Sequence, residues 1–215
     1  MKAIKIGILF TILFSFALAI YFSFSYPQLP EKMASHWNTK GEVDGYTSRF
    51  WGLFLMPIIS LGCFLLFLFI PKIDPLKKNV EKFRKYFDIF ILIFILFSLY
   101  IYLLTIFWNF GFRFNMSQLM APAMGFLFFY CGILIKNAKR NWFIGIRTPW
   151  TLSSDKVWDK THEIGGKLFK IMGIISFLGI IFPNYFVWLL LFSTLAITLF
   201  IFLYSYFEYQ KEMEE

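Results

Sequence analysis

Charged residues are scarce in this sequence. Asp, Glu, Lys and Arg make up only 16% of its 215 residues, whereas 59% are hydrophobic and 23% are aromatic. Soluble domains carry about 25% charged residues, so this composition excludes an ordinary soluble protein and is typical of a polytopic membrane protein. The net charge of +8 would suit a nucleic-acid-binding protein, but the basic residues lie between apolar runs, where they indicate membrane orientation. We therefore expect contact with membrane lipids and no direct contact with nucleic acid.

Cysteine and histidine are equally scarce. Cys63 and Cys131 both lie inside apolar runs and lack a C-x-x-C partner, so we interpret them as packing residues. His36 and His162 are the only histidines that could act as bases. The sequence also lacks the Walker, zinc-protease, nucleophile-elbow and dinucleotide-binding motifs. The prediction is a protein that is not an enzyme and that uses no cofactor or metal.

Ionisable residues are missing from the central turns of the apolar runs. Ion-coupled transporters usually need such a residue near the middle of the membrane, so the sequence disfavours a secondary transporter. The polar groups in these turns are hydroxyls, which we expect to bond between helices: Thr11, Ser15, Ser98, Thr105, Thr194 and Thr198.

Six apolar runs are long enough, or nearly so, to cross about 30 Å of hydrocarbon. They cover residues 6–25, 50–70, 88–109, 116–135, 168–182 and 185–207. The sequence thus predicts an all-α, polytopic helical membrane protein with about six transmembrane helices in a single membrane domain, residues 1–215. A cleaved signal peptide is the alternative for the first run, although that run exceeds the usual length. A re-entrant hairpin is the alternative for the short fifth run.

The basic residues are divided unevenly between the two sides of the predicted spans. Two lie at the N-terminus, six between residues 72 and 85, eight between residues 136 and 170 and one at position 211, which makes 17 of the 21. The remaining four are Lys32, Lys40, Arg49 and Arg113. The positive-inside rule then predicts that both termini are cytoplasmic. Residues 26–49 become an extracellular folded loop, and residues 136–167 become a cytoplasmic loop.

Turn-forming residues predict a folded structure for the outer loop. Pro27 and Pro30 stiffen its start, while Gly41 and Gly45 favour turns. We predict a short hairpin that pairs residues 35–37 with residues 42–44. A metal bound by His36 and a nearby carboxylate is the less favoured alternative, because the residues lack ligand spacing.

Residues 72–87 are predicted to form a basic, cytoplasmic amphipathic segment. Asp74 is expected to be the N-cap of its helix and Pro75 the first helical residue. Its apolar residues recur at helical spacing: Leu76, Val80, Phe83 and Phe87. Lysine and arginine cover the other face, so we interpret the segment as an interfacial helix held by anionic headgroups.

The longest non-spanning stretch is residues 141–166. Pro149 predicts an extended residue before it, Ser153-Ser154-Asp155 predicts the start of a helix, and Gly165-Gly166 predicts its end. One stripe of this helix should be polar and solvated: Asp155, Asp159, His162 and Glu163. The opposite stripe should be largely apolar: Val157, Trp158, Thr161, Ile164 and Leu168. A metal at Asp155, Asp159 and His162, as in a membrane-embedded metal-dependent enzyme, is the alternative.

Two stretches of the sequence resemble the SdpI family of bacterial immunity proteins. The inner one comprises Asn141, residues 145–152 (GIRTPWTL), Ser154, Trp158, residues 160–162 (KTH) and Gly165-Gly166. The outer one comprises YPQLP, HWN and GEVDGY within residues 26–46. The sequence departs from the family pattern at Ala34, where proline is usual and would make the outer loop more rigid. It also departs at Glu163, where a basic residue is common, so the inner partner is left open.

The resemblance implies an integral membrane protein that protects a producing bacterium from a secreted peptide toxin. It also implies, from the best-known form in the family, that a cytoplasmic transcriptional repressor is held at the membrane when toxin is present. The residues expected to face the toxin are His36, Trp37, Asn38, Asp44 and Tyr46. The residues expected to bind the cytoplasmic partner are Asn141, Arg147, Thr148, Pro149, Trp150, Trp158 and His162. Aromatic and charged groups of this kind dominate the binding energy of interfaces.

Overall fold

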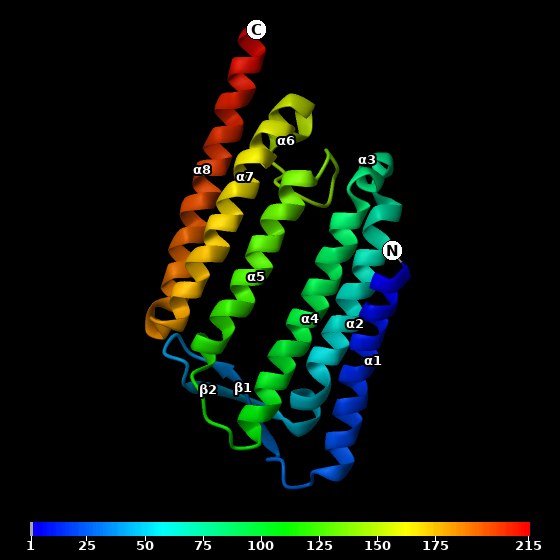
Figure 1. Ribbon diagram of the computed structural model, residues 1–215, viewed down its shortest axis with the longest axis vertical. Coiled ribbons are helices and arrows are strands. Elements are labelled where there is room, and N and C mark those ends of the chain that lie inside the picture. Colours follow the sequence, from blue (N-terminus) through cyan, green and yellow to red (C-terminus); the bar gives the residue numbers. More distant parts are fainter. Residues whose placement is uncertain (1) are drawn as a thin grey trace.

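The protein is a bundle of long helices with one small hairpin, seen in a computed structural model that describes residues 2–215 (Figure 1). Five helices are long and apolar enough to cross a membrane. They are α1 (Lys2–Ser25), α2 (Arg49–Ile73), α4 (Arg84–Asn109), α5 (Met116–Asn137) and α8 (Phe186–Glu214). The remaining elements are β1 (Lys32–Trp37), β2 (Val43–Ser48), α3 (Lys77–Lys82), α6 (Pro149–Ser153), α7 (Asp155–Ser176), and the 3-10 turns η1 (Phe177–Ile180) and η2 (Pro183–Tyr185). The predicted all-α, multi-pass membrane protein is confirmed.

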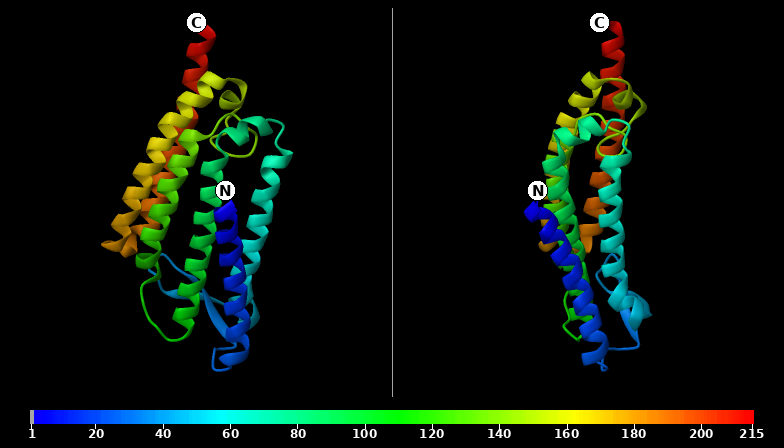
Figure 2. Two further views of the ribbon diagram at one scale, coloured as in Figure 1. Left: turned by 45° about the vertical axis from the view of Figure 1, so that its right-hand side comes forward. Right: turned by 90° about the vertical axis from the view of Figure 1, so that its right-hand side faces the viewer.

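The helices form two groups of three. α1, α2 and α4 pack against one another, and α7 packs between α5 and α8. The two groups meet chiefly where α4 contacts α5, as the views in Figures 1 and 2 agree. The molecule therefore has two halves, which we call the α1–α4 half and the α5–α8 half.

The prediction that Gly165-Gly166 ends the helix was wrong. α7 continues for three more turns, to Ser176, because its glycines provide a close helix–helix contact instead. A Cβ atom on Gly166 would lie 2.8 Å from the carbonyl oxygen of Gly132 in α5, and one on Gly173 would lie 2.7 Å from that of Gly125. Small residues in facing positions let two backbones approach in this way.

The short fifth run belongs to this longer helix. The 22 residues of α7 span about 33 Å at 1.5 Å per residue, and α7 lies alongside α5 and α8 (Figure 1). The chain then turns through η1 and η2 into α8. α7 is thus one continuous helix, whose first turns are too polar for it to count among the five apolar ones.

The hydroxyls inside the helices mostly bond within their own helix, so the predicted contacts between helices were largely wrong. Thr11 donates to the carbonyl oxygen of Gly7, and Ser98 donates to that of Phe94. A carbonyl one turn earlier is always within reach of such a side chain, whereas a partner on another helix must be aligned. Thr194 is different, because its hydroxyl lies 3.5 Å from the sulfur of Met172 in α7.

The basic segment of residues 72–87 differs from its prediction at its start. The helix begins at Lys77 rather than at Pro75, and its N-cap is Leu76. Asp74 instead accepts hydrogen bonds from two backbone N–H groups, those of Leu76 (2.6 Å) and of Trp142 (2.9 Å). These bonds hold the carboxylate in a turn, where it ties α2 to the loop that follows α5. The apolar side of the segment was predicted to lie at the membrane interface, but Val80, Phe83 and Phe87 are buried in the protein core, while Leu76 is half-buried.

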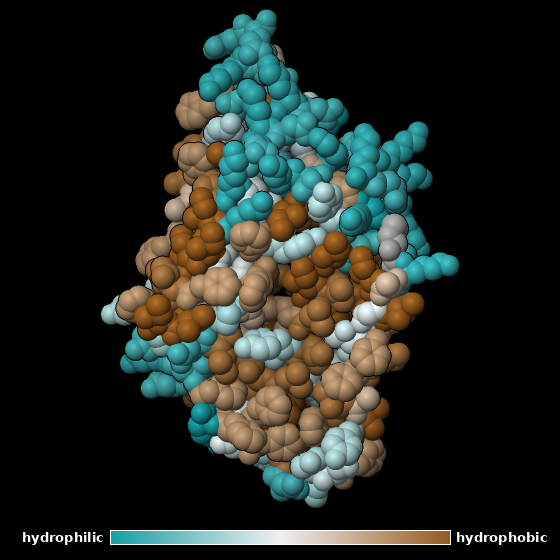
Figure 3. Space-filling view, in the orientation of Figure 1, coloured by the Kyte–Doolittle hydropathy of each residue, from teal (hydrophilic) through white to brown (hydrophobic). Residues whose placement is uncertain are grey.

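Polar residues gather at the two ends of the long axis, and a belt of apolar residues separates them (Figure 3). One end, which we call the basic end, carries α3, residues 136–167 and the end of α8, and the first turn of α1 is the part of that helix nearest to it (Figure 1). The other, the hairpin end, carries residues 26–49, 110–115 and 177–185. The segments that hold most of the basic residues therefore lie together, which is the arrangement that the sequence predicts.

Candidate functional site

Two strands at the hairpin end confirm the predicted hairpin and extend it. β1 and β2 are antiparallel, with Trp37 opposite Val43 and Lys32 opposite Ser48. The register shifts around His36, which lies opposite Gly45. The hairpin is thus longer than the predicted three-residue pairing, and Glu42 belongs to its turn.

The hairpin is held against the helices by side chains that the sequence did not single out. Met33 is fully buried, and Gly52 of α2 leaves room for its side chain. Asn109 of α4 accepts a hydrogen bond from the Ala34 N–H (2.8 Å) and donates one to the Ala34 carbonyl (3.0 Å). A proline at position 34 would lack that N–H. In this chain the amide of Asn109 therefore provides the rigidity that we expected from a proline.

A cavity of about 260 Å³ lies beneath the hairpin, between it and α2, α4 and α5. Its lining is mostly apolar and includes Trp37, Trp51, Met56, Met116 and Met120. The indole Nε1 of Trp37 is buried and has no hydrogen-bond partner within residues 2–215. A buried donor without an acceptor costs free energy, so a ligand that brought an acceptor to this N–H would relieve that cost.

The five predicted toxin-facing residues have different environments. Trp37 and His36 line the cavity, and His36 Nδ1 lies 2.5 Å from a carboxylate oxygen of Asp44. Tyr46 is 61% exposed. Asn38 instead holds the turn, because its side-chain oxygen accepts bonds from the backbone N–H groups of positions 40 and 42. Asn38 is therefore a structural residue of the hairpin.

Asn141 organises the loop between α5 and α6, residues 138–148. It is fully buried, and its amide makes four hydrogen bonds to backbone groups of the loop. The nitrogen donates to the carbonyls of Lys139 (2.8 Å) and Ile144 (2.7 Å), and the oxygen accepts from the N–H groups of Phe143 (2.9 Å) and Ile144 (2.6 Å). All of its bonding capacity is used, so Asn141 shapes the loop rather than facing a partner.

His162 fixes the other end of this loop to α7. Its Nδ1 donates to the carbonyl of Trp158 (2.8 Å), and its Nε2 accepts the Ile146 N–H (3.0 Å), which defines a neutral ring. Burial lowers the pKa of His162 to about 4, so the ring stays neutral near pH 7. The predicted solvated stripe was wrong at this position, because the 138–148 loop and the ring of Trp158, stacked at 3.9 Å, cover the imidazole.

Gly145 makes this contact possible. Its φ is +121°, and a Cβ there would lie 2.5 Å from Nε2 of His162. Trp158 is itself fully buried and donates from its indole to the carbonyl of Ala138 (2.8 Å). Trp158 and His162 are thus the base on which the loop rests.

Thr148 and Pro149 start a helix that the sequence did not predict, α6. Thr148 is extended, as expected before a proline, and it forms a capping box with Thr151. The Thr148 hydroxyl lies 3.1 Å from that of Ser205 in α8, which connects the loop to the last helix. Trp150 packs against Phe202 and Tyr206 of α8. The predicted helix start at Ser154 is confirmed, since its hydroxyl caps α7.

The acidic stripe of α7 is ion-paired. Three pairs join it to residues outside α7: Asp155 to Arg140 (2.7 Å), Asp159 to Lys139 (3.0 Å) and Glu163 to Lys136 (3.3 Å). Glu163 also pairs with Lys167 of α7 (3.2 Å). Within residues 2–215 no three His, Cys, Asp or Glu side chains are grouped so that they could hold a metal. The geometry therefore gives no support to the alternative of a metal-dependent enzyme.

The outward surface of the 138–148 loop is made by Trp142, Phe143 and Arg147. Trp142 is 50% exposed and Phe143 is 38% exposed, and Arg147 donates to the carbonyl of Trp142 (2.6 Å). Of the seven residues predicted to bind a partner, Asn141, Thr148, Trp158 and His162 are buried. Arg147 and Pro149 are exposed, and Trp150 is half-buried. The sequence pattern did not distinguish Trp142 and Phe143 from the buried aromatic residues.

Comparisons with known proteins find matches for both the hairpin region and the region that contains the 138–148 loop. Residues 137–205 match the SdpI/YfhL protein family, and residues 10–61 match a domain of unknown function, DUF1648. The chain is 26% identical to Immunity protein SdpI of Bacillus subtilis (strain 168) over 187 residues, which are 86% of this chain and 87% of that protein. No solved structure matches. The protein is a multi-pass membrane protein whose region at residues 137–205 is similar to the SdpI/YfhL family.

Proposed function

We propose that this protein is an immunity protein, which protects the bacterium that carries it from a secreted, membrane-active peptide toxin. The similarity to Immunity protein SdpI over most of both chains supports this function. The proposal places the hairpin outside the cell and the basic end inside, as the uneven distribution of basic residues suggests. The toxin would then reach the hairpin end first.

The braced hairpin above an apolar cavity is the observation that carries the proposal. Binding sites for apolar ligands are concave, largely preformed and equipped with a few polar groups. Here Asn109 holds the hairpin in place, the cavity offers methionine and tryptophan side chains, and the Trp37 N–H is a free donor. A peptide can place an apolar side chain in such a cavity and accept the indole hydrogen bond with a carbonyl oxygen. Tyr46, on the exposed face, would contact the rest of the peptide.

The test begins with deletion of the gene and challenge of the cells with candidate toxic peptides. The double variant Trp37→Ala/Tyr46→Ala should lose protection at an unchanged amount of membrane protein. Trp37→Phe keeps an aromatic ring but lacks the N–H, so it should weaken protection about tenfold, as expected for one buried hydrogen bond.

The matched control is Phe112→Ala/Tyr185→Ala. Both residues are 64% exposed aromatics at the hairpin end, and neither lines the cavity. Protection should survive in this control. Equal loss of protection in both double variants would show that exposed aromatics in general matter, and full protection by Trp37→Ala/Tyr46→Ala would refute recognition at the hairpin.

We also propose that the 138–148 loop binds a soluble cytoplasmic partner, a transcriptional repressor. The proposal rests on the exposed Trp142, Phe143 and Arg147, which combine aromatic and charged groups on a loop fixed by Asn141 and His162. The variant Trp142→Ala/Arg147→Ala should lose recruitment of the partner to membranes and keep protection. The control Lys156→Ala/Met213→Ala changes exposed residues of α7 and α8 at the same end. Normal recruitment by the first variant, or a similar loss in the control, would refute docking at the loop.

A further inference from the structure

The two halves of the molecule neutralise their basic residues differently. At the basic end of the α5–α8 half, most lysines and arginines pair with carboxylates, as Lys160 does with Glu208 (2.5 Å) and Lys139 with Asp159 (3.0 Å). In the α1–α4 half seven lysines have no carboxylate within 4.0 Å among residues 2–215: Lys2, Lys5, Lys72, Lys77, Lys78, Lys82 and Lys85. The acids of this half have other partners, since Asp74 accepts backbone N–H groups and Asp88 pairs with Arg84 (2.7 Å).

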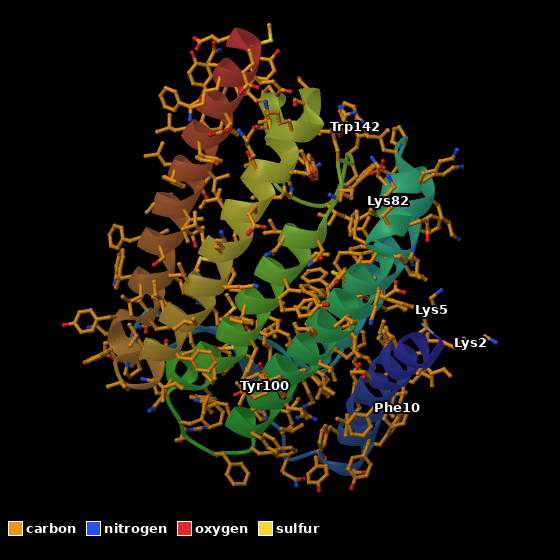
Figure 4. The ribbon with its side chains drawn as sticks, turned by 45° about the horizontal axis from the view of Figure 1, so that its top comes forward. Lys2, Lys5, Phe10, Lys82, Tyr100 and Trp142 are labelled. Atoms are coloured by element: carbon orange, nitrogen blue, oxygen red, sulfur yellow. The ribbon has the colours of Figure 1, made fainter. Side chains whose placement is uncertain are left out.

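These unpaired lysines lie at one end of the α1–α4 half. Figure 4 shows Lys2 and Lys5 extending from the first turn of α1, on the same side of the molecule as Lys82 on α3. Like charges gathered on one surface repel one another, so anions from outside the chain would stabilise the arrangement. A membrane leaflet with anionic headgroups supplies them.

Three of the lysines surround a hollow at the turn between α2 and α3. It measures about 430 Å³ and is lined by Pro71, Lys72, Lys77, Lys78 and Glu81. Glu81 is the one acid there, and its carboxylate lies 3.9 Å from Arg84. The volume is that of a ligand site rather than of a single ion. Three ammonium groups around one hollow suit a ligand with more than one negative charge.

Exposed apolar side chains lie on the last turns of α2, directly before the hollow. Leu66, Phe69 and Ile73 are each 56–57% exposed and recur at helical spacing, so they share one face of the helix. Lys72 adds its ammonium group 5.9 Å from the ring of Phe69. An apolar face beneath a cationic hollow is the pattern that a phospholipid satisfies, with its acyl chains on the helix and its phosphates among the lysines.

We propose that the turn between α2 and α3 is a binding site for an anionic phospholipid with two phosphate groups, of the diphosphatidylglycerol type. Lys72, Lys77 and Lys78 bind the phosphates, and the exposed face of α2 contacts the acyl chains. The site is independent of toxin recognition, because it lies at the opposite end of the molecule from the hairpin. The lipid site includes the turn after α2, which the hydrogen bond from the Trp142 N–H to Asp74 connects to the 138–148 loop.

The experiment measures the melting temperature of the detergent-solubilised full chain with added lipids. Diphosphatidylglycerol in hundredfold excess over its Kd should raise Tm by about 5 to 10 °C. Phosphatidylglycerol at equal phosphate concentration should raise it less, and phosphatidylethanolamine should leave it unchanged. The variant Lys72→Gln/Lys77→Gln/Lys78→Gln should bind diphosphatidylglycerol about 100-fold more weakly.

The matched control is Lys2→Gln/Lys5→Gln/Lys85→Gln. It removes the same charge from exposed, unpaired lysines of the same half, but none of them lines the hollow. Most of the Tm rise should remain in this control. If both triple variants lost the lipid-induced rise in Tm equally, general surface charge would explain the rise, and the proposed site would be refuted. An equal rise with inorganic pyrophosphate would show a site for soluble anions, and no rise with any lipid would also overturn the proposal.

Discussion

His162 acts as a neutral connector between α7 and the 138–148 loop rather than as a base. Both ring nitrogens bond to backbone groups, one on α7 and one on the 138–148 loop. Burial against Trp158 keeps the ring uncharged. The residue therefore positions the loop, and its protonation would remove the acceptor that Ile146 needs.

The first prediction concerns pH. The pKa of His162 is about 4 in the folded protein and about 6.5 in the unfolded chain, so the unfolded chain binds the proton first as the pH falls. The neutral His162 ring makes its full contribution to the free energy of unfolding above pH 6.5. This contribution is lost between pH 6.5 and 4 and changes no further below pH 4. The loss amounts to about 3 kcal/mol.

The measurement is the Tm of the solubilised protein across this pH range, for the natural chain and for His162→Gln. The variant should be less stable at pH 7 but should lose less stability between pH 6.5 and 4, since it has no proton to bind there. Parallel curves for the two proteins would assign the pH dependence to other groups.

The second prediction concerns Gly145. Gly145→Ala adds a Cβ at positive φ and against the His162 ring, whereas Gly111→Ala adds one at a similar φ (+98°) with no atom within 4 Å. Both variants place a residue with a Cβ at positive φ, and this backbone strain costs about 1 kcal/mol or more in each. Gly145→Ala should lower Tm further than Gly111→Ala, because the imidazole must move. Equal Tm values would mean that the loop accommodates the methyl group without cost.

At the scale of elements, the contact between α5 and α7 depends on glycines that face one another. Gly125 and Gly132 of α5 face Gly173 and Gly166 of α7, and Ser176 adds a hydrogen bond to the carbonyl of Ala121 (2.8 Å). Lipid tails are as apolar as leucine, so close packing and hydrogen bonds hold such helices together. The glycine pair at positions 165 and 166 therefore serves packing and not termination.

The third prediction tests this contact with Gly132→Ala. The new Cβ would lie 2.5 Å from the Gly166 carbonyl oxygen and 2.9 Å from the Lys170 nitrogen, and neither backbone atom can move cheaply. We expect a loss of about 1–3 kcal/mol, seen as a lower Tm. Gly62→Ala in α2 meets no atom within 4 Å and should be neutral or slightly stabilising. If both variants behaved alike, the close approach of α5 and α7 would not contribute to stability.

At the scale of the whole molecule, the segments that hold most of the basic residues lie at the opposite end of the bundle from the hairpin (Figure 1). The α5–α8 half neutralises most of its basic residues internally, while the α1–α4 half presents its lysines outward. Both arrangements suit an aqueous surface beside anionic headgroups. The charge distribution thus favours one orientation of the protein in the membrane.

The fourth prediction is this orientation. In a background without Cys63 and Cys131, a cysteine at position 40 of the hairpin turn should react with a membrane-impermeant thiol reagent in intact cells. A cysteine at position 156, at the start of α7, should react only after the membrane is opened. The reverse pattern would invert the topology and would place the hairpin in the cytoplasm.

The sequence by itself determined the class of the protein, five of its membrane helices, the hairpin, the capped start of α7 and the extended Thr148. These features depend on local composition, periodicity and turn chemistry, which a short window of sequence contains. It also determined which residues are special, since Asn141, Trp158 and His162 all hold the loop.

Only the tertiary structure decided what those residues do. A helical wheel describes one helix, so it placed His162 with the acidic stripe, although the 138–148 loop covers that position. The role of Gly166 depends on Gly132 in another helix, and the cavity beneath the hairpin needs three helices to enclose it. Burial, pairing and cavity shape arise from residues that are distant in the chain, and no local pattern encodes that distance.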